Sequence, residues 1–156
     1  MRIKQERLSA IKQIIETMNI STQEELISEL EKQGYDVTQA TVSRDISDLG
    51  LQKVKIIKGK AAVSTGRQIY SLPEIERLRS LLNEFMVSID KTDNLVVVKS
   101  HPGTAQAVAA AIDAVKWHNV LGTVGGDDTI LVITRTSDVA DFIVQRLSKL
   151  REEKTL

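Results

Sequence analysis

The sequence contains no cysteine, few aromatic residues and no long apolar run. The absence of cysteine excludes disulfides and thiolate metal sites. Aromatic residues make up only 3% of the chain, which disfavours binding of single-stranded nucleic acid by base stacking. No apolar stretch approaches the roughly 20 residues that span a bilayer. The first residues, MRIKQERLSAIKQ, carry charges where a signal peptide needs an apolar centre. We therefore expect a cytoplasmic protein without a membrane partner.

The composition is that of a globular protein with an uneven distribution of charge. The 156 residues are 42% hydrophobic and 27% charged, which is enough for one medium or two small domains. The 21 basic and 21 acidic side chains cancel over the whole chain, but residues 44–67 hold six basic and two acidic side chains. Such a stretch is either a nucleic-acid footprint or an ordinary solvated face, and charge alone does not separate the two.

The first 50 residues contain three segments with apolar residues at helical spacing. The first segment predicts a helix over residues 4–18. The second follows Ser21, the expected N-cap, which forms a capping box with Glu24. The glycine of KQGYD suits the end of that helix. The third segment, QATVSRDISDLG, is expected to begin after an N-cap at Thr38 and to end at Gly50.

The third helix and the residues after it suggest contact with DNA. Its polar side chains lie away from the apolar face, and Gln and Arg can bind base edges in bidentate fashion. LQKVKII and RQIYSL are expected to form two strands around a basic loop, so the whole predicts a winged helix-turn-helix. Lysines in such a wing bind phosphates without reading sequence. A protein-interaction module is the alternative. The candidate DNA-binding residues are Gln39, Thr41, Ser43, Arg44, Ser47, Lys53, Lys55, Lys58 and Lys60.

Leu72-Pro73 interrupts the pattern and predicts a domain boundary. We expect a winged-helix domain over residues 1–72, a linker with the start of a connecting helix over 73–79, and a second domain over 80–156. The order β-β-α-β-β-α in the last part predicts an α+β domain, a four-stranded antiparallel sheet with two helices. A core this small and an alanine-rich helix, AVAAAIDAV, favour oligomerisation. The last helix is expected to begin after Ser137 and to bury Phe142.

Two groups of polar residues in the second domain are candidates for a binding site. Gln106 and Asp113 share one helix face, which either grips a ligand or is a solvent-facing stripe. Asp127 and Asp128 follow two glycines and directly precede the apolar run of a strand. Adjacent carboxylates can cap a turn, hold a metal, perform acid–base chemistry or bind a cation. His101 lies at the start of the helix and is either a local hydrogen-bonding residue or a ligand contact.

Of these alternatives, a cationic ligand fits the aspartates best. Mg²⁺ sites are usually shared with phosphates, and Ca²⁺ needs more oxygen ligands than the sequence offers here. Hydrolases use carboxylates from separate positions rather than from sequence neighbours, and no serine or cysteine nucleophile has a recognisable base beside it. A guanidinium presents a planar fork that matches carboxylates. We expect no enzymatic activity, no catalytic residues and no metal.

Three stretches of the sequence resemble the arginine repressor family of bacteria, and the resemblance spans essentially the whole chain. They are TQATVSRDISDLGLQKVK, NLVVVKSHPGTAQAVAAAID and LGTVGGDDTILVI. The resemblance implies an N-terminal winged helix and a C-terminal domain that binds arginine and oligomerises. It implies trimers that stack into a hexamer with L-arginine between them. It places Ser43 and Arg44 in the DNA reader and gives ligand roles to Gln106, Asp113, Asp127 and Asp128, with His101 and Thr129 as further candidates.

The function implied by the resemblance is transcriptional regulation in response to L-arginine. The amino acid would be a co-repressor, and the targets would be palindromic operators of arginine biosynthesis and catabolism genes; no other cofactor is implied. One alternative is an accessory subunit that works with a second, paralogous arginine regulator. A less favoured alternative is an amino-acid-binding module without DNA function, against which the basic wing argues.

Overall fold

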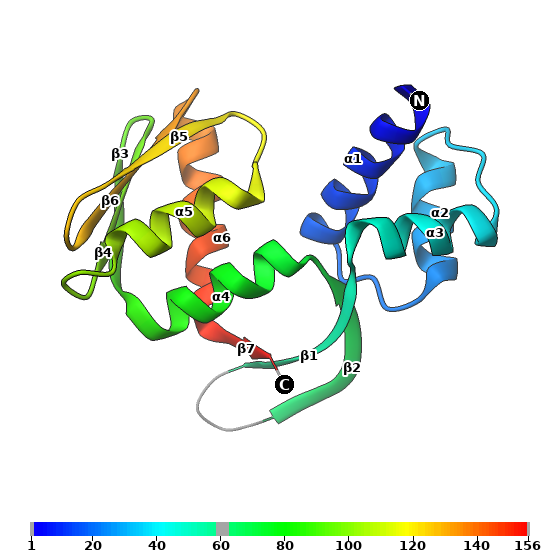
Figure 1. Cartoon of the computed structure of the whole chain (residues 1–156), viewed down its shortest axis with the longest axis horizontal. Helices are drawn as coiled ribbons and strands as arrows, with labels where there is room; N and C mark the ends of the chain where they lie inside the picture. Colours follow the sequence, from blue (N-terminus) through cyan, green and yellow to red (C-terminus); the bar gives the residue numbers. More distant parts are fainter. Residues whose placement is uncertain (1, 59–62, 156) are drawn as a thin grey trace. The chain divides into compact units, whose positions relative to one another are not determined.

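The computed structural model describes the backbone of residues 2–58 and 63–155 and the side chains of residues 3–57 and 67–155 (Figure 1). The described chain forms two compact units. The first contains residues 2–57 and 63–73 together with Thr155, and the second contains residues 74–154 with Lys58. Each unit has its own buried apolar core.

The first unit consists of three helices followed by two strands. The helices are α1 (Arg2–Thr17), α2 (Gln23–Lys32) and α3 (Gln39–Leu49), and the strands are β1 (Gln52–Lys58) and β2 (Val63–Ser71). α1 packs on α2, α2 packs on α3, and β1 and β2 are neighbours in one sheet. The side chains at its centre are fully buried: Ile11, Leu26, Leu30 and Val42. The predicted winged helix-turn-helix is therefore confirmed.

Short polar residues set the helix ends of this unit, with one difference from the sequence prediction. Thr38 caps α3 as predicted, because its Oγ1 accepts a hydrogen bond from the amide of Thr41 at 3.2 Å. Gly50 ends α3 in the left-handed conformation, at φ 65°.

Ser21 is not the N-cap of α2, and that prediction is wrong by one residue. Thr22 is the cap, and its Oγ1 accepts from the amide of Glu25 at 3.1 Å. The Glu25 carboxylate accepts in turn from the amide of Ser21 at 2.8 Å. Ser21-Glu24 and Thr22-Glu25 have the same spacing, and a long-range contact selects between them, because the hydroxyl of Ser21 accepts a hydrogen bond from Arg67 of β2.

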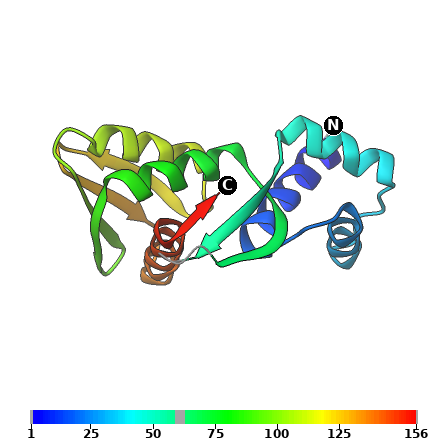
Figure 2. The same cartoon turned by 90° about the horizontal axis from the view of Figure 1, so that it is seen from below.

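The second unit is a four-stranded antiparallel sheet covered by helices. α4 (Pro73–Phe85) leads into β3 (Met86–Thr92) and β4 (Leu95–Ser100), and α5 (Ala105–Val115) separates these strands from β5 (Val120–Gly125) and β6 (Thr129–Thr134). α6 (Ser137–Glu152) and β7 (Glu153–Thr155) end the chain. The sheet order is β3-β4-β6-β5, which confirms the predicted α+β domain. α5 packs against β5 and β6, and α6 packs against β3, β4 and β6 (Figures 1 and 2).

Only one face of the central strands is buried. In β4 and β6 every second residue is inaccessible, and the register places Val96 opposite Val132 and Val98 opposite Ile130. Their neighbours along the strands are half-exposed, or exposed in the case of Lys99, and lie on the opposite face. The helices of this unit therefore cover one side of the sheet, and the other side stays accessible in the single chain.

Two predictions for α6 are wrong in detail. The N-cap is Thr136 rather than Ser137, since Thr136 Oγ1 accepts from the amide of Val139 at 3.3 Å. Phe142 is 41% exposed rather than buried. The buried stripe of α6 follows a helical spacing that leaves out Phe142, and it consists of Ala140, Ile143, Leu147 and Leu150.

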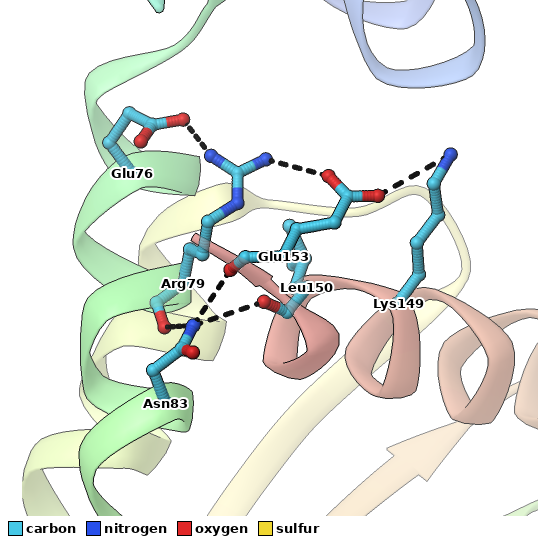
Figure 3. Close-up of polar contacts among 6 residues, drawn as sticks. All are labelled: Glu76, Arg79, Asn83, Lys149, Leu150 and Glu153. Atoms are coloured by element: carbon cyan, nitrogen blue, oxygen red, sulfur yellow. Dashed lines mark hydrogen bonds and ion pairs between the residues drawn. The ribbon is translucent and has the colours of Figure 1, made fainter. Parts of the chain in front are cut away.

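A buried charge cluster joins α4 to the end of α6 (Figure 3). The guanidinium of Arg79 contacts the carboxylate of Glu76 and lies 3.6 Å from Oε2 of Glu153, and both Arg79 and Glu153 are almost fully buried. The Asn83 side-chain amide donates to the carbonyls of Arg79, Leu150 and Glu153 at 2.9–3.2 Å. Residues 74–79 therefore belong to a helix fixed to the second unit.

We expect Glu153→Ala to lower the free energy of unfolding by about 3 kcal/mol, because it removes one partner of a buried ion pair. Chemical denaturation of the full chain measures this change. Glu152→Ala is the matched control, since this neighbouring carboxylate is exposed and its loss should change stability by no more than about 0.5 kcal/mol. Equal effects of the two substitutions would show that the buried pair contributes nothing particular to the fold.

Candidate DNA-binding surface and ligand site

α3 presents a row of polar side chains to solvent in the first unit. Gln39, Ser43, Arg44 and Ser47 are all exposed, as the sequence predicts for a helix that enters a DNA groove. Thr41 is half-buried, and its hydroxyl lies 3.0 Å from that of Thr38. Thr41 therefore completes the helix N-terminus instead of joining the exposed row.

The basic residues after α3 lie in different environments. Lys53 is exposed on β1, and its ammonium lies 5.2 Å from the ring centre of Tyr70, a cation–π distance. Lys55 is half-buried in β1. Lys58 ends β1, but its side chain and the whole of Lys60 lie outside the described residues.

Arg67, part of the same basic stretch, is engaged within the fold. Its Nη2 lies 2.6 Å from Glu25 Oε1, and its Nε donates to Ser21. The amide of Tyr70 donates to the carbonyl of Ile20 at 2.7 Å. These bonds tie β2 to the start of α2, so part of the positive charge counted in the sequence is paired within the fold, although the Arg67 side chain stays exposed.

In the second unit, the turn between β5 and β6 holds Asp127 and Asp128 by their main chain. The carbonyl of Asp127 accepts from the amides of Gly103 at 3.0 Å and Ala105 at 3.3 Å, and that of Asp128 accepts from the amide of Ser100 at 2.8 Å. Both aspartates are exposed. The turn is therefore anchored to the end of β4 and the start of α5 through backbone atoms, which leaves both carboxylates facing solvent.

Gly125 permits the close packing of β5 on α5 beside this turn. A Cβ atom at Gly125 would lie 3.3 Å from both the carbonyl oxygen of Ala105 and the Cβ of Ala109. Real Cβ atoms rarely approach other atoms so closely, so a larger residue would push the strand away from the helix.

The two polar residues of α5 both bond to β5. Gln106 Nε2 donates to the carbonyl of Gly125 at 2.6 Å, and Asp113 Oδ2 accepts from the hydroxyl of Thr123 at 2.8 Å. Gln106 and Asp113 are exposed, so they form an edge along the α5–β5 boundary that continues to the aspartate turn. Thr123 is not among the residues predicted from the sequence. Its place two residues before Gly125, on the same face of the strand, is the pattern that would have identified it.

A chain of hydrogen bonds orients Asp128. Lys99 Nζ donates to Thr129 Oγ1 at 2.6 Å, and Thr129 Oγ1 donates to Asp128 Oδ1 at 2.9 Å. The sheet register fixes this arrangement, because Lys99 of β4 and Thr129 of β6 are paired residues. Lys99 thereby contributes a positive charge close to the aspartate pair.

The structure gives His101 a local role in the main chain. Its amide donates to the carbonyl of Phe85 at 2.9 Å, and its carbonyl accepts from the hydroxyl of Thr104 at 2.6 Å. These bonds shape the turn that leads into α5. The imidazole is part of an exposed residue and lies at the same end of the sheet as the aspartate turn.

Among the residues that the structure describes, no three side chains of the metal-binding types come together in a way that would hold an ion. Within the same residues, every helix is too short or too polar to cross a lipid bilayer.

Comparison with known proteins assigns both units to one family. Residues 3–77 match the family model described as "Arginine repressor, DNA binding domain". Residues 82–149 match the model described as "Arginine repressor, C-terminal domain". The chain belongs to the arginine repressor family. Members of this family are DNA-binding transcriptional regulators rather than enzymes, so the predicted class of function and the expectation of no enzymatic activity are confirmed.

Individual members of the family are similar to the chain over almost their whole length. The arginine repressor of Caldicellulosiruptor bescii is 46% identical over 151 residues, which cover 95% of this chain and 97% of that protein. The arginine repressor of Symbiobacterium thermophilum is 44% identical over 154 residues, covering 95% and 98%. That of Exiguobacterium sibiricum is 45% identical over 150 residues, covering 92% and 96%. Because the matches include the DNA-binding unit, an amino-acid-binding module without DNA function is disfavoured.

We expect Gly125→Ala to destabilise the second unit by about 1–3 kcal/mol, because the added methyl group overpacks the contact between β5 and α5. Gly122→Ala, on the same strand, is the control, since a Cβ there would have no atom within 4 Å. Thermal or chemical denaturation of both variants, without ligand, measures the difference. A Gly125→Ala variant as stable as Gly122→Ala would contradict the close approach at this position.

Proposed function

We propose that the protein is a repressor whose co-repressor is L-arginine, bound at the α5–β5 edge and the adjacent turn. Four polar side chains would hold the ligand, namely Gln106, Asp113, Asp127 and Asp128. The observation that carries the proposal is the anchoring of the turn by its main chain, which leaves two neighbouring carboxylates exposed to solvent. Exposed carboxylates on a rigid turn form a preorganised receptor for a guanidinium or an ammonium group.

The charges around the turn agree with a cationic ligand. Asp113, Asp127 and Asp128 are three carboxylates, and Lys99 is a cation connected through Thr129 to one of them, Asp128. A ligand with both a guanidinium and an ammonium would relieve the repulsion that remains between neighbouring carboxylates. His101 and Thr129 lie at the rim of the site and complete the set of ligand residues that we propose.

We further propose that copies of the chain associate through the accessible face of the sheet. Half-exposed apolar residues follow the centre of this face, with Leu95 paired with Ile133 and Val97 paired with Leu131. Val124 continues the row opposite Leu131 and is 59% exposed. An apolar surface of this kind is normally covered by another protein surface. The family resemblance supports a trimer, and a hexamer made of two trimers with L-arginine between them.

The proposed mechanism couples ligand binding to DNA binding. L-arginine that bridges two trimers would stabilise the hexamer, and several winged helices would then engage one palindromic operator together. Winged-helix units joined in one assembly bind DNA more tightly, because each has a high effective concentration near the operator once another is bound. Linkage requires that DNA tighten arginine binding by the same factor, a coupling of about 1–3 kcal/mol. The genes concerned would be those of arginine biosynthesis, repressed, and catabolism, activated, and the protein would act in the cytoplasm.

An accessory role beside a paralogous arginine regulator is the second candidate. The presence of all three ligand aspartates favours a chain that senses arginine by itself. Binding of a selected operator by the purified protein alone, in the presence of L-arginine, would support the autonomous function.

We expect Asp128→Asn to weaken L-arginine binding by at least about tenfold, because a charge-assisted hydrogen bond contributes about 1.5–3 kcal/mol. Isothermal titration calorimetry on the purified protein measures the change. Asp138→Asn is the control, since it removes the same charge from an exposed residue at the start of α6. Absence of heat with L-arginine, together with heat from another amino acid, would refute the proposed ligand.

We expect Arg44→Ala to lower the preference for operator DNA, because a bidentate contact to a base edge contributes about 1–3 kcal/mol of discrimination. Lys53→Ala should instead weaken binding to all duplexes evenly and reduce the slope of log affinity against log salt by about 1. Gel-shift titrations would use a duplex that the wild-type protein enriches from a random pool, and the same duplex shuffled. If both variants lose the same affinity for both duplexes, Arg44 does not read bases, and the assignment of base reading to Arg44 and phosphate contact to Lys53 is wrong.

A further inference from the structure

Two ion pairs connect α1 to the exposed helix α3 of the first unit. Arg7 donates from Nε and Nη2 to the two carboxylate oxygens of Asp45, at 2.5 and 3.0 Å. Lys4 Nζ lies 2.8 Å from Asp48 Oδ2. The partners lie three residues apart on each helix, so the two pairs follow each other along one seam. We call these four residues the α1–α3 ladder.

The two pairs of the ladder differ in burial. The carboxylate side chain of Asp45 is 2% exposed and the Arg7 side chain 14%, whereas Lys4 and Asp48 are each about half exposed. The hydrogen bond to Asp45 raises the pKa of Arg7 above its usual value. The inner pair is a buried, two-point contact, and it is the kind that fixes the orientation of a side chain and its helix. The outer pair is a solvated contact whose main effect is on charge.

The position of Asp45 in α3 makes this orientation relevant to DNA. Asp45 is buried directly after Arg44 in the sequence, and Ser43 and Ser47 flank it at two residues on either side. The side chain that anchors α3 therefore lies in the same helical turn as the side chains that face solvent. A small rotation of α3 about its axis would redirect Arg44, and the two-point contact with Arg7 opposes such a rotation.

The charges of the ladder also matter to a helix that approaches phosphates. Asp45 and Asp48 are the acidic residues of α3, whose sequence is QATVSRDISDL. Unpaired carboxylates there would repel the DNA backbone. Each is paired with a cation of α1, so the surface that α3 offers to DNA keeps the positive charge of Arg44.

We propose that α1 takes part in DNA recognition through the ladder: Arg7 is a positioning residue that sets α3 through Asp45, and Lys4 cancels the charge of Asp48. This inference rests on the proposed role of α3 as the reading helix. It predicts that Arg7 affects the discrimination between sequences, whereas Lys4 affects affinity for all duplexes.

The test of Arg7 separates positioning from folding. The variant Arg7→Gln/Asp45→Asn removes both buried charges and keeps groups that can hydrogen-bond, so its melting temperature should stay close to that of the wild type. The ratio of dissociation constants for the shuffled and the selected duplex should fall about tenfold, as for loss of one base contact. Arg7→Lys should give a smaller loss of discrimination. If the double variant does not fold, Arg7→Lys is the test variant, and its ratio of dissociation constants should still be lower than that of the wild type.

An unchanged ratio in a folded variant of Arg7 would overturn the proposal, because the pair would then serve stability only. Arg44→Ala, measured in parallel, distinguishes failure of the proposed reading role of α3 from failure of the proposed role of Arg7. If Arg44→Ala leaves the ratio unchanged, the reading role of α3 itself is wrong. If Arg44→Ala lowers the ratio and the double variant does not, only the role of Arg7 is wrong.

Lys4 is tested by its effect on charge. Lys4→Gln should weaken binding of both duplexes about two- to threefold more than Lys12→Gln at low salt, because it also uncovers a carboxylate of α3. Lys12→Gln removes the same charge from α1, at a position outside the ladder. The difference between the two variants should disappear as the salt concentration rises. Equal effects at low salt would refute the role of Lys4.

Discussion

The second unit is built on a sheet that buries only one of its faces, and the candidate ligand site depends on this constraint. α5 and α6 pack on the buried side, over the alternating apolar residues of β4 and β6. α5 packs on β5, which is the edge strand of the sheet. The polar side chains of α5 therefore lie beside this edge. Gln106 and Asp113 therefore bond to β5 and stay exposed. The same constraint leaves an apolar face uncovered, on which the proposed association of copies relies.

The structure uses charged side chains in two ways. Arg79 and Glu153, like Arg7 and Asp45, are buried and hold helices together through side-chain contacts. Asp127 and Asp128 are held by their carbonyl groups, which leaves their carboxylates exposed. A carboxylate with a buried cationic partner fixes structure, whereas an exposed carboxylate on a turn anchored by its backbone can accept a ligand. The carboxylate of Asp128 also accepts a hydrogen bond from Thr129, which orients it. This difference supports the choice of the aspartate turn for the proposed ligand site.

Much of the fold could be predicted because it follows from local patterns. Periodicity predicted the helices and strands, and three stretches of sequence, one of them around Asp127 and Asp128, resembled the family to which the chain belongs. The wrong predictions concern the choice between adjacent residues, for a helix cap or for a place in the buried stripe of a helix. Thr22 and Thr136 cap helices for which Ser21 and Ser137 are equally suitable in sequence, and Phe142 lies just beside the buried stripe of α6. A contact from Arg67, 46 residues away in the chain, engages the hydroxyl of Ser21, and local spacing contains no information about it.

The sequence by itself determined the two-part architecture and the polar row of α3, and it suggested the carboxylates of the candidate ligand site. These depend on spacing along one helix, strand or turn, where covalent geometry fixes which side chains share a face. Only the tertiary structure decided which charges pair across elements. It joined Arg7 to Asp45, Arg67 to Glu25, and Lys99 through Thr129 to Asp128. Such partners are brought together by packing of distant segments, and many pairings of the same residues would satisfy the sequence equally well.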